Sequence, residues 1–257
     1  MPTSEGDRTF HDHFSPLAER YAAARPSYPP ELFTWLADLS ARRERAWDVG
    51  TGSGQAAVAL AEHFAEIVAS DAAAAQIAQA RPHPRVRYRV AAAEASGLEV
   101  GSVDLVTAAQ AAHWFDLGRF YAEVRRVLAP GGAVALWTYH GVTLAPAVDR
   151  VVERYYRDVV GPFWPAERAA VEDGYRSLPF PFAEVAAPTF EIRQRWDLGR
   201  FAAYLATWSA SRHWSDAHGG ADPLAEIAED LAAVWGDARR RREVRWPLAL
   251  RVGRPVG

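Results

Sequence analysis

Residues 48–54 read Asp48-Val-Gly50-Thr-Gly52-Ser-Gly54, a stretch with a glycine at every second position. The apolar residues before it predict the end of a buried strand, and residues 55–64 predict a helix with one apolar face. Glycine permits positive φ angles and lets a ligand approach the main chain closely. Amide groups at the start of a helix point towards a polar or negative ligand. The stretch therefore predicts a strand–loop–helix unit that binds a ligand.

Two common ligands of such loops fit this sequence poorly. A dinucleotide-binding loop requires a third glycine where this chain has Gln55. A phosphate-binding loop for nucleoside triphosphates requires a lysine after its last glycine, and the chain contains no lysine. A strand–helix turn without any ligand also uses glycine, so the loop alone leaves that alternative open.

An acidic residue at a second strand end points to a ribose. Residues 67–71 form a short apolar run that ends in Asp71, about 20 residues beyond the first glycines. An acidic side chain at this spacing accepts hydrogen bonds from ribose hydroxyls. Asp71 could also cap the helix expected over residues 72–80, and the two roles can coexist. The spacing favours the ribose role.

The remaining pattern predicts an α/β fold. Further strands are expected at residues 87–90, 103–107 and 133–137, with a helix at 120–128 and a turn at 130–132. Strands that alternate with helices indicate a mostly parallel sheet with helices on both faces. The ligand of such a sheet lies at the carboxyl ends of its strands.

Over residues 21–137 the chain resembles the class I S-adenosylmethionine (SAM)-dependent methyltransferases of the type 11 group. The resemblance is carried by residues 48–54, Asp71, Ala93-Glu94, 103–106 and 127–132. A narrower likeness, to the trans-aconitate methyltransferase-like branch, is carried by residues 21–29, 110–115 and 204–209. The resemblance implies SAM as cofactor and a Rossmann-like seven-stranded, mostly parallel sheet whose last strand is antiparallel.

The resemblance also implies a set of cofactor-binding residues. They are Tyr21, Arg25, Gly50, Thr51, Gly52, Gly54, Asp71, Ala72, Ala93, Glu94 and Gln110. Many relatives place an aspartate before the Ala-Glu pair to bind the adenine amino group, but this chain has Ala92 there. Adenine would then depend on main-chain groups of Ala93 and Glu94, or on another donor. Arg25 could pair with the carboxylate of SAM or of the acceptor.

Histidines near the strand ends are candidates for the chemistry. His113 follows a strand at the carboxyl edge of the sheet and is the candidate general base, although a structural histidine bonded to the main chain is the competing interpretation. A carboxylate acceptor needs no base, whereas a hydroxyl, amine or carbon acceptor can require one. Substrate contacts are expected from Trp114, His140, Arg212 and His213.

Three parts are expected along the chain. Residues 1–30 form an arm that closes over the cofactor, residues 31–140 form the SAM-binding core, and residues 141–257 supply lid helices and the strands that complete the sheet. The third part is expected to contain helices at 145–156, 165–177, 198–209 and 223–235, and strands at 190–196 and 245–252. An aromatic insert at 161–165 suits a lid that shapes the acceptor pocket.

Composition excludes several functions. A net charge of −3 argues against nucleic acid as a partner. The absence of cysteine excludes disulfides and thiolate metal sites, and the absence of lysine excludes Schiff-base chemistry. His11-Asp-His13 does not make a metal motif, so no metal is expected. No apolar run is long enough for a membrane span, and residues 1–14 lack a signal-peptide core, so we expect a cytoplasmic enzyme. We expect it to be a monomer or a homodimer.

These observations predict a SAM-dependent methyltransferase that acts on a small-molecule acceptor, a carboxylate or a hydroxyl, by in-line SN2 transfer. A methyltransferase of nucleic-acid bases would usually carry Asn/Asp-Pro-Pro-aromatic where this chain has residues 110–113. Three alternatives stay open: methylation of carbon or nitrogen, SAM chemistry other than methyl transfer, and a non-catalytic regulatory SAM-binding protein.

Overall fold

The computed structural model describes residues 26–256 of the chain. Most of the arm expected over residues 1–30, including Tyr21 and Arg25, therefore lies outside the described residues.

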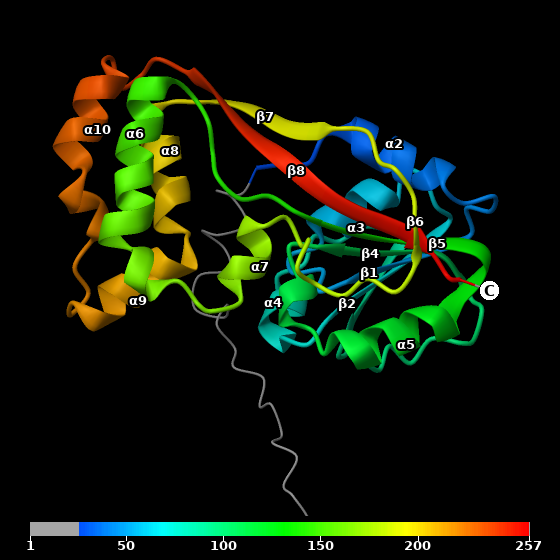
Figure 1. The fold of residues 1–257 in the computed structure, drawn as a ribbon. Coiled ribbons are helices and arrows are strands. Elements are labelled where there is room, and N and C mark those ends of the chain that lie inside the picture. Colours follow the sequence, from blue (N-terminus) through cyan, green and yellow to red (C-terminus); the bar gives the residue numbers. More distant parts are fainter. Residues whose placement is uncertain (1–25, 257) are drawn as a thin grey trace, which may run out of the picture.

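Five parallel strands form the centre of the sheet, in the order β3-β2-β1-β4-β5 (Figure 1). They are β1 (Arg45–Val49), β2 (Glu66–Asp71), β3 (Val86–Val90), β4 (Val103–Ala109) and β5 (Leu128–Thr138). The strand order reverses at β1, because β2 lies on one side of it and β4 on the other. Ligands of open α/β sheets bind at such a reversal, outside the carboxyl ends of the strands.

The sheet continues with antiparallel strands. The long β8 (Arg242–Arg254) pairs with β5, and both β6 (Ala183–Glu184) and β7 (Phe190–Trp196) pair with β8. The predicted Rossmann-like sheet with an antiparallel last strand is confirmed. Within residues 26–256 the sheet has eight strands, one more than the resemblance implies, because β6 and β7 pair with different parts of β8.

Alternate residues of β1 pack into different cores on the two faces of the sheet. Ala46 faces α2 (Pro30–Asp38) and α3 (Gln55–Leu60), whereas Trp47 faces Phe120 of α5 (Leu117–Val127). Figure 1 shows α2 and α3 on one side of the sheet and α5 on the other. Successive side chains of β1 are therefore buried on opposite faces of the sheet, as expected for a buried parallel strand.

The helices of the core differ from the predicted bounds for local reasons. The helix expected at 120–128 begins earlier, because the Asp116 side chain accepts a hydrogen bond from the Arg119 amide at 3.2 Å and caps α5. α4 (Ala74–Ala78) is shorter than the helix expected at 72–80. The turn expected at 130–132 lies within β5, where pairing with β4 is interrupted between Leu128 and Ala133.

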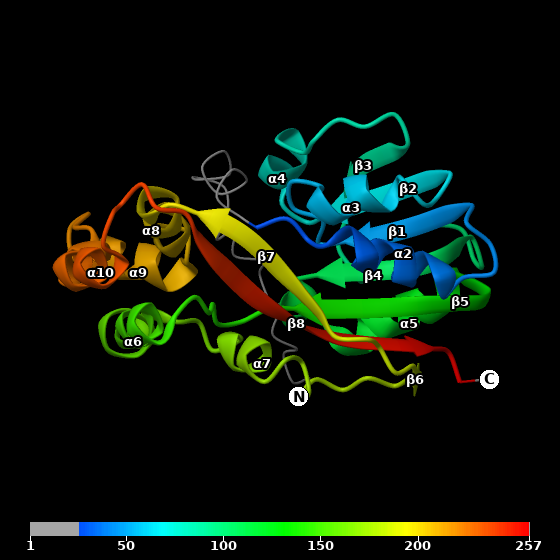
Figure 2. The same cartoon turned by 90° about the horizontal axis from the view of Figure 1, so that it is seen from above.

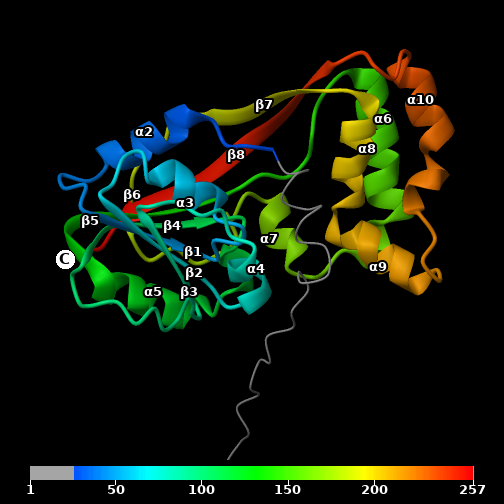
Figure 3. The same ribbon diagram turned by 180° about the vertical axis from the view of Figure 1, so that it is seen from behind.

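A helical group lies beyond one end of the sheet. It consists of α6 (Pro146–Arg154), the π-helical turn η3 (Tyr155–Val159), η4 (Gly161–Phe163), α8 (Leu198–Ala206), α9 (Ser209–Ala217), η5 (Pro223–Glu226) and α10 (Ala228–Trp235). α7 (Arg168–Glu172) lies between this group and the sheet (Figures 1 and 3). The antiparallel pair β7 and β8 runs from the helical group to the sheet (Figure 2).

The prediction of one helix over 165–177 is wrong. α7 ends at Glu172, and Gly174 then takes a φ of 70°, which ends the helix.

β7 has the bounds predicted for the strand at 190–196. Aromatic side chains connect the pair β7 and β8 to the helical group. The indole nitrogen of Trp246 on β8 donates to the hydroxyl of Tyr204 on α8 at 2.9 Å, and Trp246 packs on Trp196 of β7. No helix in residues 26–256 is long and apolar enough to cross a membrane.

Candidate functional site

The three loop glycines all have left-handed φ angles but have different surroundings. A Cβ at Gly50 would lie 2.5 Å from the Ala111 Cβ, and one at Gly54 would lie 2.1 Å from the Tyr88 hydroxyl. These two glycines therefore allow the loop to pack tightly against its neighbours. A Cβ at Gly52 would meet only the Gln76 side chain, at 3.7 Å. Gly52 is therefore the position of the loop that a ligand can approach.

Asp48 fixes the loop from inside the protein. Its side chain is buried and accepts hydrogen bonds from the Thr51 hydroxyl at 2.6 Å and the Thr107 hydroxyl at 2.7 Å. Burial raises the pKa of Asp48 to about 6, although the hydrogen bonds from both threonines oppose this shift. The Thr51 side chain thus supports the shape of the loop.

Asp71 joins the end of β2 to the loop. One carboxylate oxygen accepts a hydrogen bond from the Gly52 amide and the other from the Ala73 amide, both at 2.9 Å. A carboxylate can accept about four hydrogen bonds, so these contacts are compatible with a ribose diol. Ala72 follows as an exposed residue. The alternative role of Asp71 as the cap of α4 is wrong, because Ala73 is the N-cap residue and no side chain caps this helix.

The segment after β3 lies beside the start of α5. Ala93 is buried, and the Glu94 carboxylate accepts a hydrogen bond from the Asp116 amide at 2.9 Å. Gln55, the residue that argued against a dinucleotide, donates from its side chain to the Pro26 carbonyl at 2.8 Å. This bond connects the first described residue to the helix that follows the glycine loop.

Gln110 turns the chain at the end of β4. It has a φ of 56°, and its amide donates to the Trp137 carbonyl at 2.9 Å. Its side-chain nitrogen donates to the Tyr139 carbonyl at 3.0 Å, and its side-chain oxygen accepts from the Thr138 hydroxyl at 2.6 Å. The side chain of Gln110 therefore connects the end of β4 to the end of β5.

His113 and Trp114 follow in the short 3-10 helix η2 (Ala112–Trp114). The Nδ1 atom of His113 lies 2.8 Å from the Tyr175 hydroxyl, and the His113 ring packs on the rings of Trp114 and Tyr175. α7 contacts η2 directly. Trp114 is 36% exposed, so its ring is available at the surface between these elements.

The other predicted substrate residues lie in two places. His140 follows β5, and partial desolvation of its ring together with the nearby Arg168 guanidinium lowers its pKa. Arg212 and His213 lie on α9, which packs against η4, and His213 Nδ1 lies 3.1 Å from the Phe163 carbonyl. The structure thus places the segment that carries Gln110, His113 and Trp114 beside the glycine loop, through Ala111 and Phe115. Arg212 and His213 lie in the helical group.

Taken together, the loop and its surroundings fit SAM. An open main chain at Gly52 suits the amino-acid part, and the Asp71 carboxylate suits the ribose. Neither feature provides a phosphate clamp, and the sulfonium of SAM needs none. Among residues 26–256 no group of three or more His, Asp or Glu side chains is arranged to hold a metal ion.

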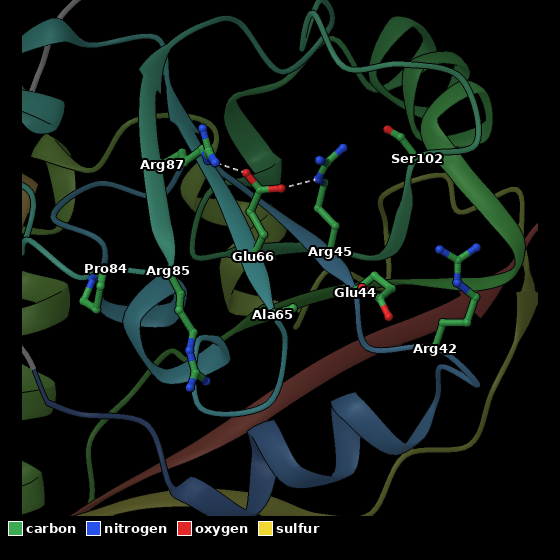
Figure 4. Close-up of a pocket in the computed structure, with 9 residues that line it drawn as sticks. All are labelled: Arg42, Glu44, Arg45, Ala65, Glu66, Pro84, Arg85, Arg87 and Ser102. Carbon is green, nitrogen blue, oxygen red and sulfur yellow. Dashed lines mark hydrogen bonds and ion pairs between the residues drawn. The ribbon is translucent and has the colours of Figure 1, made fainter.

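A cavity of about 510 Å³ opens at the opposite edge of the sheet (Figure 4). It is lined by the amino-terminal ends of β1, β2 and β3, so it lies about 13 Å along β1 from the glycine loop. Glu66 points between Arg45 and Arg87 and pairs with both (Figure 4). Arg42 pairs with Asp104, and Arg85 donates to the Ala61 carbonyl. The arginines of this cavity are thus bonded within the protein, and it is separate from the candidate site.

Sequence reasoning missed two residues of the site, Tyr175 and Thr138. Tyr175 fell inside the helix expected over 165–177, although Gly174 was a signal that the helix ends before it. Thr138 is the last residue of β5, and nothing in the sequence links it to its partner Gln110.

Comparisons with known proteins find methyltransferases. Residues 47–136 match the family described as "Methyltransferase domain". A Dictyostelium discoideum protein named "Putative methyltransferase" is 34% identical over 230 residues, which cover 88% of this chain and 87% of that protein. A solved structure from Anaeromyxobacter dehalogenans, described as "a Putative Type II Methyltransferase", is 51% identical. It superimposes with a TM-score of 0.85 over 90% of this chain and 99% of that chain.

A third relative matches a smaller part. A Mycobacterium bovis protein named "Uncharacterized methyltransferase" is 39% identical over 124 residues, about half of each chain.

Proposed function

Because this chain belongs to the SAM-dependent methyltransferases, we propose that it transfers the methyl group of SAM to an oxygen atom of a small molecule. The chain is therefore an enzyme, and SAM is its cofactor. The acceptor is a carboxylate or a hydroxyl, and it is not a nucleic acid, in keeping with a net charge of −3.

The observation that carries this proposal is the contact between the glycine loop and the segment that bears His113. A Cβ at Gly50 would lie 2.5 Å from the Ala111 Cβ, so η2 begins directly beside the loop. α7 also contacts η2. An acceptor bound beside η2 would therefore lie close to a cofactor held by the loop.

When bound, SAM supplies a methyl group on a positively charged sulfur, which is the electrophile of an in-line displacement. The open main chain at Gly52 and the Asp71 carboxylate hold the cofactor in one orientation. Positioning of this kind can contribute about 7–11 kcal/mol to lowering the barrier.

His113 removes the proton when the acceptor is a hydroxyl. A carboxylate is already ionised at neutral pH and needs no base. Trp114, whose ring packs on that of His113, and His140, which follows β5, are further proposed acceptor contacts. Arg212 and His213 of α9 would contact only the distal part of an acceptor that reaches the helical group. The likeness to the trans-aconitate methyltransferase-like branch makes small carboxylic acids the first acceptors to test.

The proposal is tested by incubating the protein with SAM and a panel of small carboxylic acids, phenols, alcohols and amines. Formation of S-adenosylhomocysteine is measured, and the methylated product is identified by mass spectrometry. We expect turnover with oxygen acceptors. With a hydroxyl acceptor, His113→Gln is expected to lower kcat by about 100- to 10,000-fold while the Kd for SAM stays unchanged.

Two results would contradict the proposal. Turnover with amines alone would show that oxygen is not the acceptor atom. Full activity of His113→Gln with a hydroxyl acceptor would show that His113 is not the base.

A further inference from the structure

The cavity at the amino-terminal edge of the sheet carries an excess of positive charge. Its volume of about 510 Å³ lies within the range of about 300–1,000 Å³ that is typical of small-molecule sites. The charged residues that line it are Arg42, Arg45, Arg85, Arg87, Glu44 and Glu66. The four arginines exceed the two glutamates by two positive charges, and Asp104, which pairs with Arg42 without lining the cavity, reduces this excess to one. The cavity is thus positive in a chain whose net charge is −3.

Three of these arginines use only Nε for their bonds within the protein. Nε of Arg45 donates to the Glu66 carboxylate at 2.7 Å, and Nε of Arg87 pairs with the other oxygen of that carboxylate. Arg42 pairs with Asp104 through Nε at 3.7 Å. Within residues 26–256 the two terminal nitrogens of each of these side chains form no hydrogen bond. Each guanidinium therefore keeps the pair of terminal N–H groups that binds an oxyanion through two parallel hydrogen bonds.

Glu66 holds two of the arginines on opposite sides of one carboxylate. Arg45 of β1 is the register partner of Glu66 on β2, and Arg87 comes from β3 on the other side (Figure 4). Neighbouring strands lie about 4.8 Å apart, so the main chains of β1 and β3 are about 10 Å apart. The Arg87 side chain is 76% exposed, and ion pairs exposed to water are weak. An added anion can therefore compete with Glu66 for these guanidinium groups.

We propose that this cavity binds a small molecule that carries two or more phosphate groups. One anionic group is held by one guanidinium, whereas linked phosphates reach both Arg45 and Arg87, with Arg42 as a third cation. A pyrophosphate also carries more negative charge than a dicarboxylate and offers more oxygen atoms to the terminal nitrogens. The cavity is separate from the glycine loop, so the inference does not rest on the proposed function.

A nucleic acid is the other source of linked phosphates. Proteins that bind nucleic acids present basic residues as a patch or stripe over one face and usually carry a positive net charge. Here the arginines line one cavity in a chain of net charge −3. These two observations favour a small molecule.

The test is isothermal titration calorimetry of the full chain with inorganic phosphate, pyrophosphate, tripolyphosphate and succinate. The titrations are made at low ionic strength, because salt screens contacts between exposed charges. We expect pyrophosphate to bind at least about tenfold more tightly than phosphate, since the second phosphate group gains charge-assisted hydrogen bonds. No binding of pyrophosphate or tripolyphosphate would overturn the inference. Succinate binding as tight as pyrophosphate binding would overturn the assignment to phosphate, and an oligonucleotide that binds more tightly than tripolyphosphate would overturn the assignment to a small molecule.

Two kinds of variant are expected to have opposite effects. Arg45→Gln and Arg87→Gln each remove one guanidinium, so each should weaken pyrophosphate binding by about 10- to 100-fold. Glu66→Gln removes the carboxylate that competes for both arginines, so it should strengthen binding by about 2- to 5-fold. Wild-type affinity in both arginine variants would overturn the inference. Urea unfolding checks that each variant is folded.

A matched control lies on β7. Arg193 and Glu191 form an exposed ion pair and do not line the cavity, so Arg193→Gln and Glu191→Gln change the net charge in the same way as the test variants. Both should leave the Kd for pyrophosphate within about twofold of the wild type, because salt and water screen distant exposed charges. An equal loss of affinity in Arg193→Gln and Arg87→Gln would show that net charge, and not the cavity, attracts the anion, and this would overturn the inference.

Discussion

The hydroxyl of Tyr175 lies 2.8 Å from Nδ1 of His113, and this contact joins the segment after α7 to the segment after β4. The two segments come from different parts of the chain. His113 belongs to the parallel core, whereas Tyr175 belongs to the insertion between β5 and β8. The orientation of the candidate base therefore depends on how the insertion is anchored to the sheet.

Arg251 of β8 provides that anchor. Its guanidinium donates to the Tyr175 carbonyl at 3.0 Å and to the Leu178 carbonyl at 2.8 Å. We expect Arg251→Met to lower the free energy of unfolding by about 1–3 kcal/mol, because two carbonyls lose their donor. Urea unfolding measures this change. The control is Arg193→Met, which removes an exposed ion pair with Glu191 and should cost under about 1 kcal/mol. Equal effects of the two variants would contradict the anchoring role.

Asp71 is predicted to bind the ribose of SAM. Asp71→Asn should weaken SAM binding by about 1–3 kcal/mol, because the uncharged side chain loses a charge-assisted hydrogen bond. Isothermal titration calorimetry with SAM measures the change. The thermal stability of the variant should be measured as well, because Asp71 also accepts hydrogen bonds from the Gly52 and Ala73 amides. Glu99→Gln, at an exposed position, is the control. An unchanged Kd in a folded Asp71→Asn protein would disprove the ribose contact.

The loop glycines are predicted to respond differently to alanine. Gly54→Ala should lower stability strongly, because its Cβ would lie 2.1 Å from the Tyr88 hydroxyl. Gly52→Ala meets only Gln76 at 3.7 Å, so its cost in stability should be limited to the left-handed φ, about 1–2 kcal/mol. The Kd for SAM, measured on folded Gly52→Ala, should rise sharply because the methyl group enters the space assigned to the cofactor. SAM binding as tight as in the wild type would place the cofactor elsewhere.

The buried Asp48 predicts a pH dependence of stability. Its pKa is raised from 3.8 to about 6 in the folded protein, so its contribution to stability is fully present below pH 3.8 and is lost as the pH rises through about 6. The loss amounts to roughly 3 kcal/mol. Asp48→Asn cannot ionise, so the unfolding free energy of the variant minus that of the wild type should rise by this amount between about pH 4 and pH 7. Urea unfolding across this range tests it. A difference that is constant with pH would contradict the raised pKa.

The parallel core could be predicted because its signals are local. The glycines at 50, 52 and 54 and the apolar runs that end at Val49 and Asp71 lie within short windows of sequence, and the structure has β1, β2 and α3 there. The likeness to methyltransferases added the antiparallel last strand, which β8 supplies.

The part of the site on the insertion could not be predicted in the same way. Thr138 donates to Gln110, and Tyr175 lies beside His113, and no periodic pattern encodes such contacts. The role of Gln110 in binding the cofactor stays a prediction. Its side-chain bonds to Thr138 and Tyr139 follow from the left-handed turn after β4, which the sequence does not reveal. The contact of Arg212 and His213 with the substrate also stays a prediction. The sequence does not show where α9 packs within the insertion.

The most direct test of the account is a crystal structure of the protein with S-adenosylhomocysteine. The account predicts that the ribose hydroxyls bind the Asp71 carboxylate, that the amino-acid part lies over Gly52, and that the sulfur faces η2 near His113. A ligand bound away from the glycine loop, or a ribose held by a residue other than Asp71, would contradict it.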